Sequence, residues 1–147
     1  MEKLIKINEQ ITVGPQPSEQ ELAELKRMGF KSIVNVRAEG EKDQPLSPQV
    51  EGDQARAMGL HYVHIAVPMG NFQAAQVDQF RVAMAKLPQP VFSHCLGGKR
   101  AGVLAMMHEA VEEGLSGEEA ITRANEKGLN IDKPELAQFM TRYVDEH

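Results

Sequence analysis

Short β-branched runs alternate with stretches of helical spacing along the chain, and this alternation constrains the fold more than any other feature. The runs are ITVG (11–14), SIVNVR (32–37), HYVHIAV (61–67) and PVFSHC (90–95). Strands separated by helices of about 10 to 15 residues are typical of βαβ units, whose strands lie parallel. We therefore predict an α/β fold: a single three-layer domain over residues 1–147, with a central, mainly parallel sheet flanked by helices.

Helix-capping patterns support this division of the chain. Ser18 is followed three residues later by Glu21, and Ser116 by Glu119, which is the pattern of a capping box. Pro48 follows Ser47, as expected at the first position of a helix. The expected helices are 18–29, 47–59, 72–87, 99–114, one that begins at 116, and one from 132 to about 143.

Composition narrows the partners and the compartment. The chain has 147 residues and a formal net charge of −5, which argues against nucleic acid or an anionic membrane as the main partner but not against a small anionic substrate. A single Cys excludes an internal disulfide. Nothing in the sequence is typical of a signal peptide or a membrane span, so we expect a reducing, cytoplasmic setting. The sequence gives no indication of oligomeric state.

The single cysteine lies in VFSHCLGGKRAGVL (91–104), at the end of a predicted strand. Ligands of open parallel sheets bind outside the carboxyl ends of the strands. After Cys95, Gly97 and Gly98 allow a tight turn that directs backbone N–H groups inward, and the helix expected from Lys99 adds further N–H donors. Arg100 can offer a planar fork to two oxygens of an anion.

These features favour a reactive thiolate beside an anion-binding loop. Such a thiolate can attack phosphorus or sulfur and form a covalent intermediate. The alternative is a buried thiol beside an ordinary strand-to-helix turn, in which the two glycines serve only the turn.

The same residues resemble a known signature. His94, Cys95, Gly98 and Arg100 are similar to the active-site loop of cysteine-dependent protein tyrosine and dual-specificity phosphatases, which has one more residue before the Arg and a Ser or Thr after it. The chain resembles more closely the bacterial DUF442 group, whose loop is shorter and which is related to the phosphatase-like domain of beta-lactamase hydrolase-like proteins. The resemblance extends to the stretches GPQPSEQELAELKRMGFKSIVNVR (14–37) and GLHYVHIAV (59–67).

The resemblance implies a dual-specificity phosphatase-like fold and a protein tyrosine phosphatase-like hydrolase. Cys95 would attack a phosphate monoester and form a phospho-enzyme, and His94 would support the thiolate and the loop by hydrogen bonds. No metal or organic cofactor is implied. The residues expected to bind the phosphate group are Leu96, Gly97, Gly98, Lys99 and Arg100.

Two positions depart from the phosphatase pattern. These phosphatases use a carboxylic acid on an earlier loop to protonate the leaving group, but AVPMGNFQ (66–73) contains no carboxylate. Glu39, Glu41 and Asp43, in the loop after the second strand, are placed to substitute for this acid, and Glu39 and Asp43 are the candidates that we propose. Ala101 replaces the hydroxyl that assists hydrolysis of the phospho-enzyme, so we expect slow turnover.

Two other functions compete with phosphatase activity. Single-domain rhodaneses, which transfer sulfur through a persulfide, also use a short loop with Gly at this place, so Cys95 could carry a persulfide. A third alternative is a catalytically weak module that binds an oxyanion without turning it over. Arg37, at the end of a predicted strand, either contacts the substrate or forms a surface ion pair.

Overall fold

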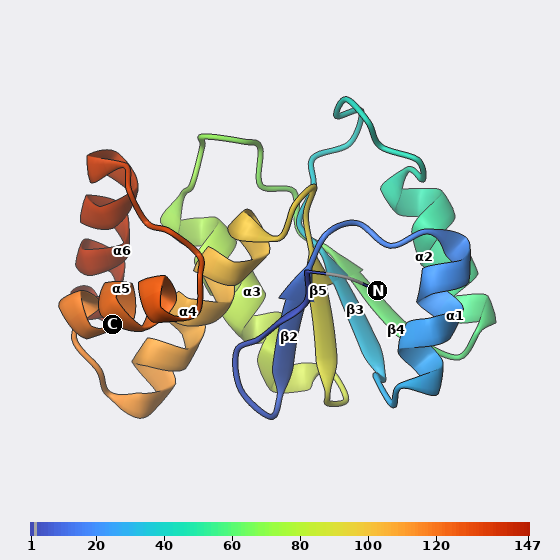
Figure 1. Ribbon diagram of the computed structural model, residues 1–147, viewed down its shortest axis with the longest axis horizontal. Helices are drawn as coiled ribbons and strands as arrows, with labels where there is room; N and C mark the ends of the chain where they lie inside the picture. The colour runs from blue at the N-terminus through green and yellow to red at the C-terminus, as the bar shows by residue number, and fades with distance from the viewer. Residues whose placement is uncertain (2) are drawn as a thin grey trace.

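A five-stranded sheet forms the centre of the molecule (Figure 1). The computed structural model describes residue 1 and residues 3–147. The strands are β1 (Ile5–Lys6), β2 (Ile11–Gly14), β3 (Ser32–Asn35), β4 (His61–His64) and β5 (Val91–His94). The helices are α1 (Glu19–Arg27), α2 (Pro48–Ala57), α3 (Ala74–Lys86), α4 (Lys99–Glu113), α5 (Gly117–Glu126) and α6 (Pro134–Glu146).

The strand order is β1-β2-β5-β3-β4, and β2, β5, β3 and β4 run parallel. Only β1 is antiparallel, and it pairs with β2. The predicted α/β fold with a mainly parallel sheet is therefore confirmed. β5 lies between β2 and β3, so His94 at its end pairs with Gly14 on one side and Asn35 on the other. Three carboxyl ends thus meet where Cys95 leaves the sheet.

Helices cover both faces of the sheet, as the three-layer prediction requires (Figure 1). α1 and α2 lie on one face, where Leu22 and Leu25 pack with Ile33 and Phe92. α3 and α4 lie on the other face, and α5 and α6 pack against α4. Successive residues of a strand point to opposite faces, so Ile33 enters the first core and Val34 the second.

The predicted capping boxes at Ser18–Glu21 and Ser116–Glu119 are both present. Two strands are shorter than their apolar runs, because β3 ends at Asn35 and β4 at His64. The chain nevertheless stays hydrogen-bonded to the sheet beyond these ends, since the N–H of Val36 donates to the carbonyl of His94 at 2.9 Å. The last helix continues to Glu146, beyond the expected end near 143. The sequence pattern did not indicate β1, whose two residues are too few to show an alternation.

None of the helices in the described part of the chain has the length and apolar character needed to cross a membrane. The described residues also contain no cluster of three His, Cys, Asp or Glu side chains placed to hold a metal ion.

Candidate active site

Cys95 follows β5 directly and lies beneath the loops at the carboxyl ends of the strands, with 2% of its surface exposed. Two neighbouring loops share this end of the sheet: residues 36–47 after β3 and residues 65–73 after β4 (Figure 1). The site therefore occupies the position at which parallel sheets bind ligands.

The turn after Cys95 depends on one glycine rather than two. Gly98 has φ +105°, and its N–H donates to Sγ of Cys95 at 3.1 Å. A Cβ at this position would also lie 3.3 Å from the backbone of Gly14. Gly97 has neither a positive φ nor a close neighbour. Gly98 is thus the residue that permits the turn and places an N–H donor on the sulfur.

Arg100, in the first turn of α4, is held in place by two acceptors. Its Nη1 donates to Oε2 of Glu41 at 2.6 Å and to the carbonyl of Val67 at 2.8 Å, and Nη2 donates to Oε1 of Glu41 at 2.9 Å. Burial lowers the pKa of Arg100, but hydrogen bonds with Glu41 and the nearby charge of Cys95 outweigh this effect and raise it. The guanidinium is therefore cationic and oriented before any ligand binds.

Glu41 carries a negative charge at this position. Partial burial alone would raise its pKa, but hydrogen bonds from Arg100, Arg37 and the N–H of Ala38 lower the pKa from its ordinary value of 4.5 to about 2. The Glu41 carboxylate is thus ionised at neutral pH and is unsuited to donate a proton to a leaving group. It also engages both Nη groups of the fork that a bound oxyanion would use.

A chain of hydrogen bonds extends from Glu41 behind the cysteine loop. Arg37 donates from Nε to Glu41 at 3.0 Å and from Nη1 to Oε1 of Gln16 at 2.5 Å. Gln16 in turn donates to Oε1 of Glu51 at 3.1 Å. Arg37 is fully buried, so the alternative of a surface ion pair is wrong.

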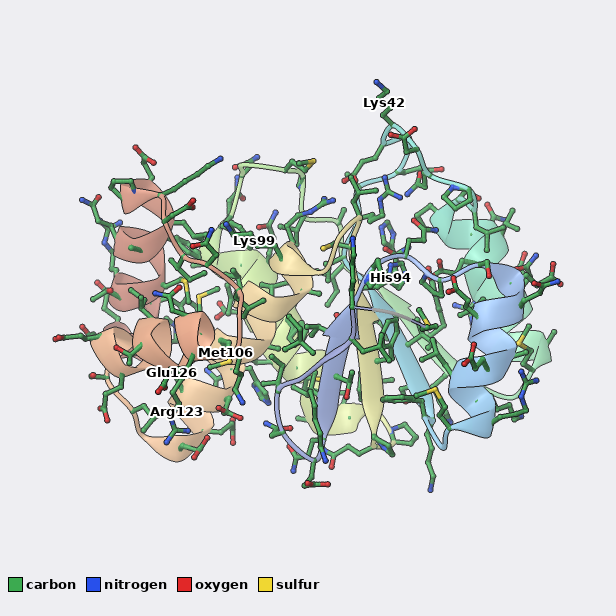
Figure 2. The ribbon with its side chains drawn as sticks, viewed as in Figure 1. Lys42, His94, Lys99, Met106, Arg123 and Glu126 are labelled. Carbon is green, nitrogen blue, oxygen red and sulfur yellow. The ribbon has the colours of Figure 1, made fainter. Side chains whose placement is uncertain are left out.

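This chain of hydrogen bonds ends at His94, whose expected support of the thiolate and the loop stays a prediction. Its Nε2 lies 2.6 Å from Oε2 of Glu51, and both side chains are fully buried. Its Nδ1 lies 3.4 Å from the carbonyl oxygen of Cys95, and its ring stacks on Phe92. Figure 2 shows His94 at the centre of the molecule, near the upper end of the sheet. His94 thus contacts the backbone of the cysteine loop rather than open solvent.

Of the other residues proposed from the sequence, some border the cavity beside Cys95 and others are exposed away from it. Leu96 and Lys99 border the cavity beside Cys95, and Lys99 also donates to the carbonyl of Asn130 at 2.9 Å. Glu39 and Asp43, the candidates for the general acid, are both exposed and do not border that cavity. Only the third carboxylate of the loop, Glu41, reaches Arg100.

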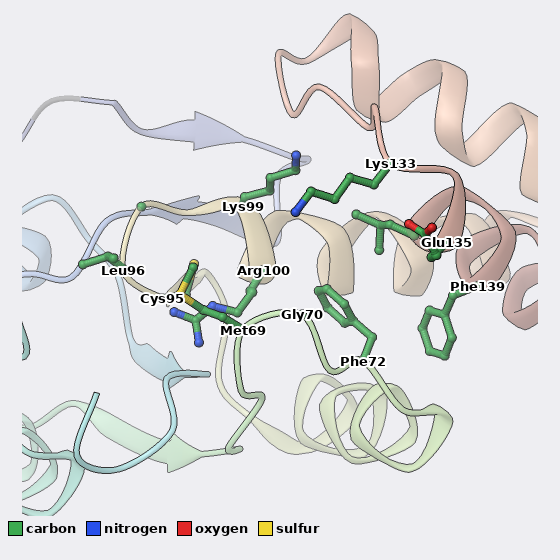
Figure 3. A pocket seen from close by; sticks show the side chains of 12 residues that line it. Met69, Gly70, Phe72, Cys95, Leu96, Lys99, Arg100, Lys133, Glu135 and Phe139 are labelled. Atoms are coloured by element: carbon green, nitrogen blue, oxygen red, sulfur yellow. The ribbon is translucent and has the colours of Figure 1, made fainter. Parts of the chain in front are cut away.

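A cavity of about 800 Å³ opens beside Cys95 and Arg100 (Figure 3). Its floor and walls come from three segments: the cysteine loop, the loop after β4, and the start of α6. Most of the side chains that line it away from the cysteine loop are apolar. They are Met69, Phe72, Leu136 and Phe139.

The sequence reasoning missed Gln16 and Glu51, which connect His94 to Arg37. Glu51 carried a signal: it lies three residues after Pro48 and four before Ala55, on the buried face of α2. A carboxylate among buried positions of a helix requires a buried polar partner. No comparable signal marks Gln16, which follows a proline in a loop.

A family model described as "Beta-lactamase hydrolase-like protein, phosphatase-like domain" matches residues 3–112. The chain belongs to this family. The resemblance to the DUF442 group is thereby confirmed, and the chain carries a phosphatase-like domain. A beta-lactamase hydrolase-like protein of Agrobacterium fabrum is 39% identical over 111 residues, which are 75% of this chain. The matched part is only 26% of that relative, so the chain corresponds to about a quarter of its length.

Solved structures agree on the fold. A DUF442 protein of Shewanella putrefaciens superimposes with a TM-score of 0.82 at 24% identity, covering 97% of this chain and 91% of that one. PTPMT1, in a crystal structure with PI(5)P, superimposes with a TM-score of 0.79 at 17% identity, covering 97% and 95%. At these identities the likeness establishes the phosphatase-type α/β fold and not the reaction.

Proposed function

We propose that the chain is a cysteine-dependent hydrolase of phosphate monoesters, with Cys95 as the nucleophile. The observation that carries the proposal is the arrangement of Cys95 and Arg100 on either side of the Gly98 turn. The thiol accepts an N–H at 3.1 Å, and the guanidinium borders the same cavity. Membership of a phosphatase-like family supports it.

In the first step, the Sγ thiolate attacks phosphorus, forming the S–P bond as the P–O ester bond breaks. The electron pair leaves with the ester oxygen. Arg100 and the N–H groups of residues 96–100 stabilise the negative charge on the transferred group. In the second step, water attacks phosphorus, the S–P bond breaks, and phosphate leaves with Cys95 restored as a thiolate. The chemistry needs a free thiol, which a reducing compartment such as the cytoplasm preserves.

The leaving group determines how well this reaction proceeds. The segment 66–73 has no carboxylate, and Glu41 is held ionised, so neither supplies an acid for a poor leaving group. Glu135 also borders the cavity, but it is exposed and lies near Phe139 rather than Cys95 (Figure 3). Glu39 and Asp43 remain the proposed acids, because their loop adjoins the site, and a role for either requires that loop to move towards the cavity. Aryl phosphates, whose leaving oxygen needs little protonation, are therefore the better substrates.

Sulfur transfer is the second candidate, and the missing acid is the observation that favours it. The Cys95 thiolate would attack the outer sulfur of a thiosulfate, forming an S–S bond as the bond to sulfite breaks. An acceptor thiolate or cyanide would then remove the outer sulfur and restore the thiolate. Sulfite leaves as a stable anion, so no step requires a general acid.

The direct test compares wild type with Cys95→Ser on para-nitrophenyl phosphate and on thiosulfate plus cyanide. Release of nitrophenol that Cys95→Ser abolishes would support the phosphatase. Thiocyanate alone would transfer the proposal to sulfur transfer. Absence of both reactions, together with phosphate binding by the wild type, would leave the third alternative, an oxyanion-binding module.

The general acid is tested by Glu39→Gln and Asp43→Asn. Loss of a general acid slows an alkyl phosphate more than a nitrophenyl phosphate, because only the alkyl leaving group needs the proton. We expect one of the two variants to show this difference, by about 10- to 100-fold. Equal rates for both variants and wild type on both substrates would remove Glu39 and Asp43 from the mechanism.

A further inference from the structure

The cavity beside Cys95 is much larger than an oxyanion requires. Its volume is about 800 Å³, whereas a water molecule occupies about 30 Å³ in the liquid and a tetrahedral oxyanion only a few times that. The greater part of the cavity therefore lies beyond the group that Cys95 and Arg100 would hold. Its size is that of a pocket for a complete small molecule.

Apolar side chains from two separate segments meet along this extra space. Met69 and Phe72 come from the loop after β4, and Leu136 and Phe139 come from the first turns of α6. The rings of Phe72 and Phe139 lie 6.0 Å apart between centroids. Figure 3 shows these two rings side by side, on the side of the cavity away from Leu96. We call these four residues the apolar wall.

Apart from Arg100, the charged groups that border the cavity are exposed. Lys99 and Lys133 extend along one side in Figure 3, and Glu135 lies near Phe139, at the edge of the apolar wall. Lys99 is also placed near Asp132, with Nζ 3.5 Å from Oδ1. A highly charged leaving group would lose hydration against the apolar wall and find no partner there, whereas a hydrocarbon group would gain from burial.

The proposed function indicates how the substrate is oriented in the cavity. If the oxyanion is bound by the cysteine loop, the group attached to it must extend away from Arg100, and the cavity continues from the loop towards Phe72 and Phe139. The loop after β4 and the start of α6 border the cavity, which is otherwise open to solvent. A flexible hydrocarbon of a small molecule fits such a space.

We propose that the apolar wall binds the hydrocarbon part of the substrate, which is thus a small amphiphile: an oxyanion ester whose organic group carries a hydrocarbon larger than one aromatic ring. This inference rests on the proposed function for the position of the oxyanion. Leu136 and Phe139 lie on α6, outside residues 3–112, whereas Met69 and Phe72 lie within them, so the apolar wall belongs only in part to the region that matches the family model.

The test uses 4-methyl-, 4-butyl- and 4-octylphenyl phosphate, kept below their micelle-forming concentrations. The three leaving groups have nearly the same acidity, so differences in kcat/KM report binding of the alkyl group rather than the rate of the chemical step. Each fully buried CH₂ is worth about fourfold in affinity. Even with partial burial, we expect kcat/KM to rise at least about tenfold from methyl to octyl.

A second measurement does not depend on turnover. Calorimetric titration of Cys95→Ser with the same three compounds should show a fall in Kd of at least about tenfold from methyl to octyl. A fall in Kd without hydrolysis by wild type would support the apolar wall and overturn the phosphatase. Hydrolysis with no dependence on chain length would overturn the apolar wall and leave the phosphatase standing.

Variants separate specific binding from general adhesion of hydrocarbon. Phe139→Ala should reduce the methyl-to-octyl difference in Kd to less than about threefold, and Met69→Ser, on an exposed side chain whose loss costs little stability, should reduce it partly. Phe30→Ala is the matched control, since Phe30 packs on Phe92 on the opposite face of the sheet, and it should keep the full difference. An unchanged difference in both Phe139→Ala and Met69→Ser would overturn the proposal.

Discussion

The side chains on the two sides of Cys95 differ in character: one set is polar and the other apolar. On one side, polar groups follow each other without interruption from Arg100 through Glu41, Arg37, Gln16 and Glu51 to His94. On the other side, the apolar wall borders an open cavity. The polar side fixes its groups by many mutual hydrogen bonds, whereas the apolar side has space that these groups do not fill.

The two sides are suited to different functions. A group that must meet a reacting atom has to be held in position in advance, and buried hydrogen bonds achieve this. A surface that only accommodates an organic group needs shape and low polarity, and it can vary without loss of the reaction. Variants should therefore have different effects on the two sides.

The largest effect on stability is expected from breaking the polar side at Glu51. Glu51→Ala removes the partner of Nε2 of the fully buried His94 and one of the two acceptors of Nε2 of the half-buried Gln16. We expect the free energy of unfolding to fall by about 3–5 kcal/mol, measured by urea denaturation. Asp53→Ala, on the exposed face of the same helix, should change it by less than about 0.5 kcal/mol. Equal losses in the two variants would refute the importance of the buried pair.

In the turn after Cys95, replacement of Gly97 should leave stability unchanged, whereas replacement of Gly98 should lower it. Gly98→Ala forces a side chain into φ +105° and against Gly14, at a cost of about 1–3 kcal/mol. Gly97→Ala meets no such obstacle and should stay within about 0.5 kcal/mol of wild type. Thermal unfolding of both variants checks this, and similar losses would show that the turn is not specific to Gly98.

Removing the negative charge of Glu41 should increase the affinity of the site for anions. Glu41→Gln removes the carboxylate that competes with a ligand for Arg100, so we expect inorganic phosphate to bind about tenfold more tightly, or about 1.4 kcal/mol. Calorimetry at low salt measures this, with Asp53→Asn as the control for loss of one distant charge. Weaker binding would mean that Glu41 serves mainly to orient Arg100.

Glu41 also gives stability a dependence on acid. Its pKa is lowered by folding, to about 2 from 4.5, so its contribution is fully present above about pH 4.5 and is lost as pH falls towards 2. Wild type should therefore lose stability faster than Glu41→Gln between pH 5 and pH 3, in urea denaturation at each pH. Parallel curves would show that Glu41 is not held ionised by the fold.

The sequence predicted the fold well, because alternating runs and capping residues such as Ser18 and Ser116 are local signals. It also predicted that Cys95 and Arg100 would be neighbours, since five positions of chain in a turn leave little freedom. It did not reveal that Glu41 would pair with Arg100, because that contact joins the loop after β3 to the first turn of α4, 59 residues further along the chain. The apolar wall was equally hidden, since the spacing of Leu136 and Phe139 is that of any amphipathic helix.

The most direct test of the central claim is intact-protein mass spectrometry of wild type, quenched in acid shortly after mixing with para-nitrophenyl phosphate. We predict a mass increase of one phosphoryl group, located on the peptide that contains Cys95 and absent from Cys95→Ser. Steady release of nitrophenol with no adduct on Cys95, or with full activity in Cys95→Ser, would contradict the account.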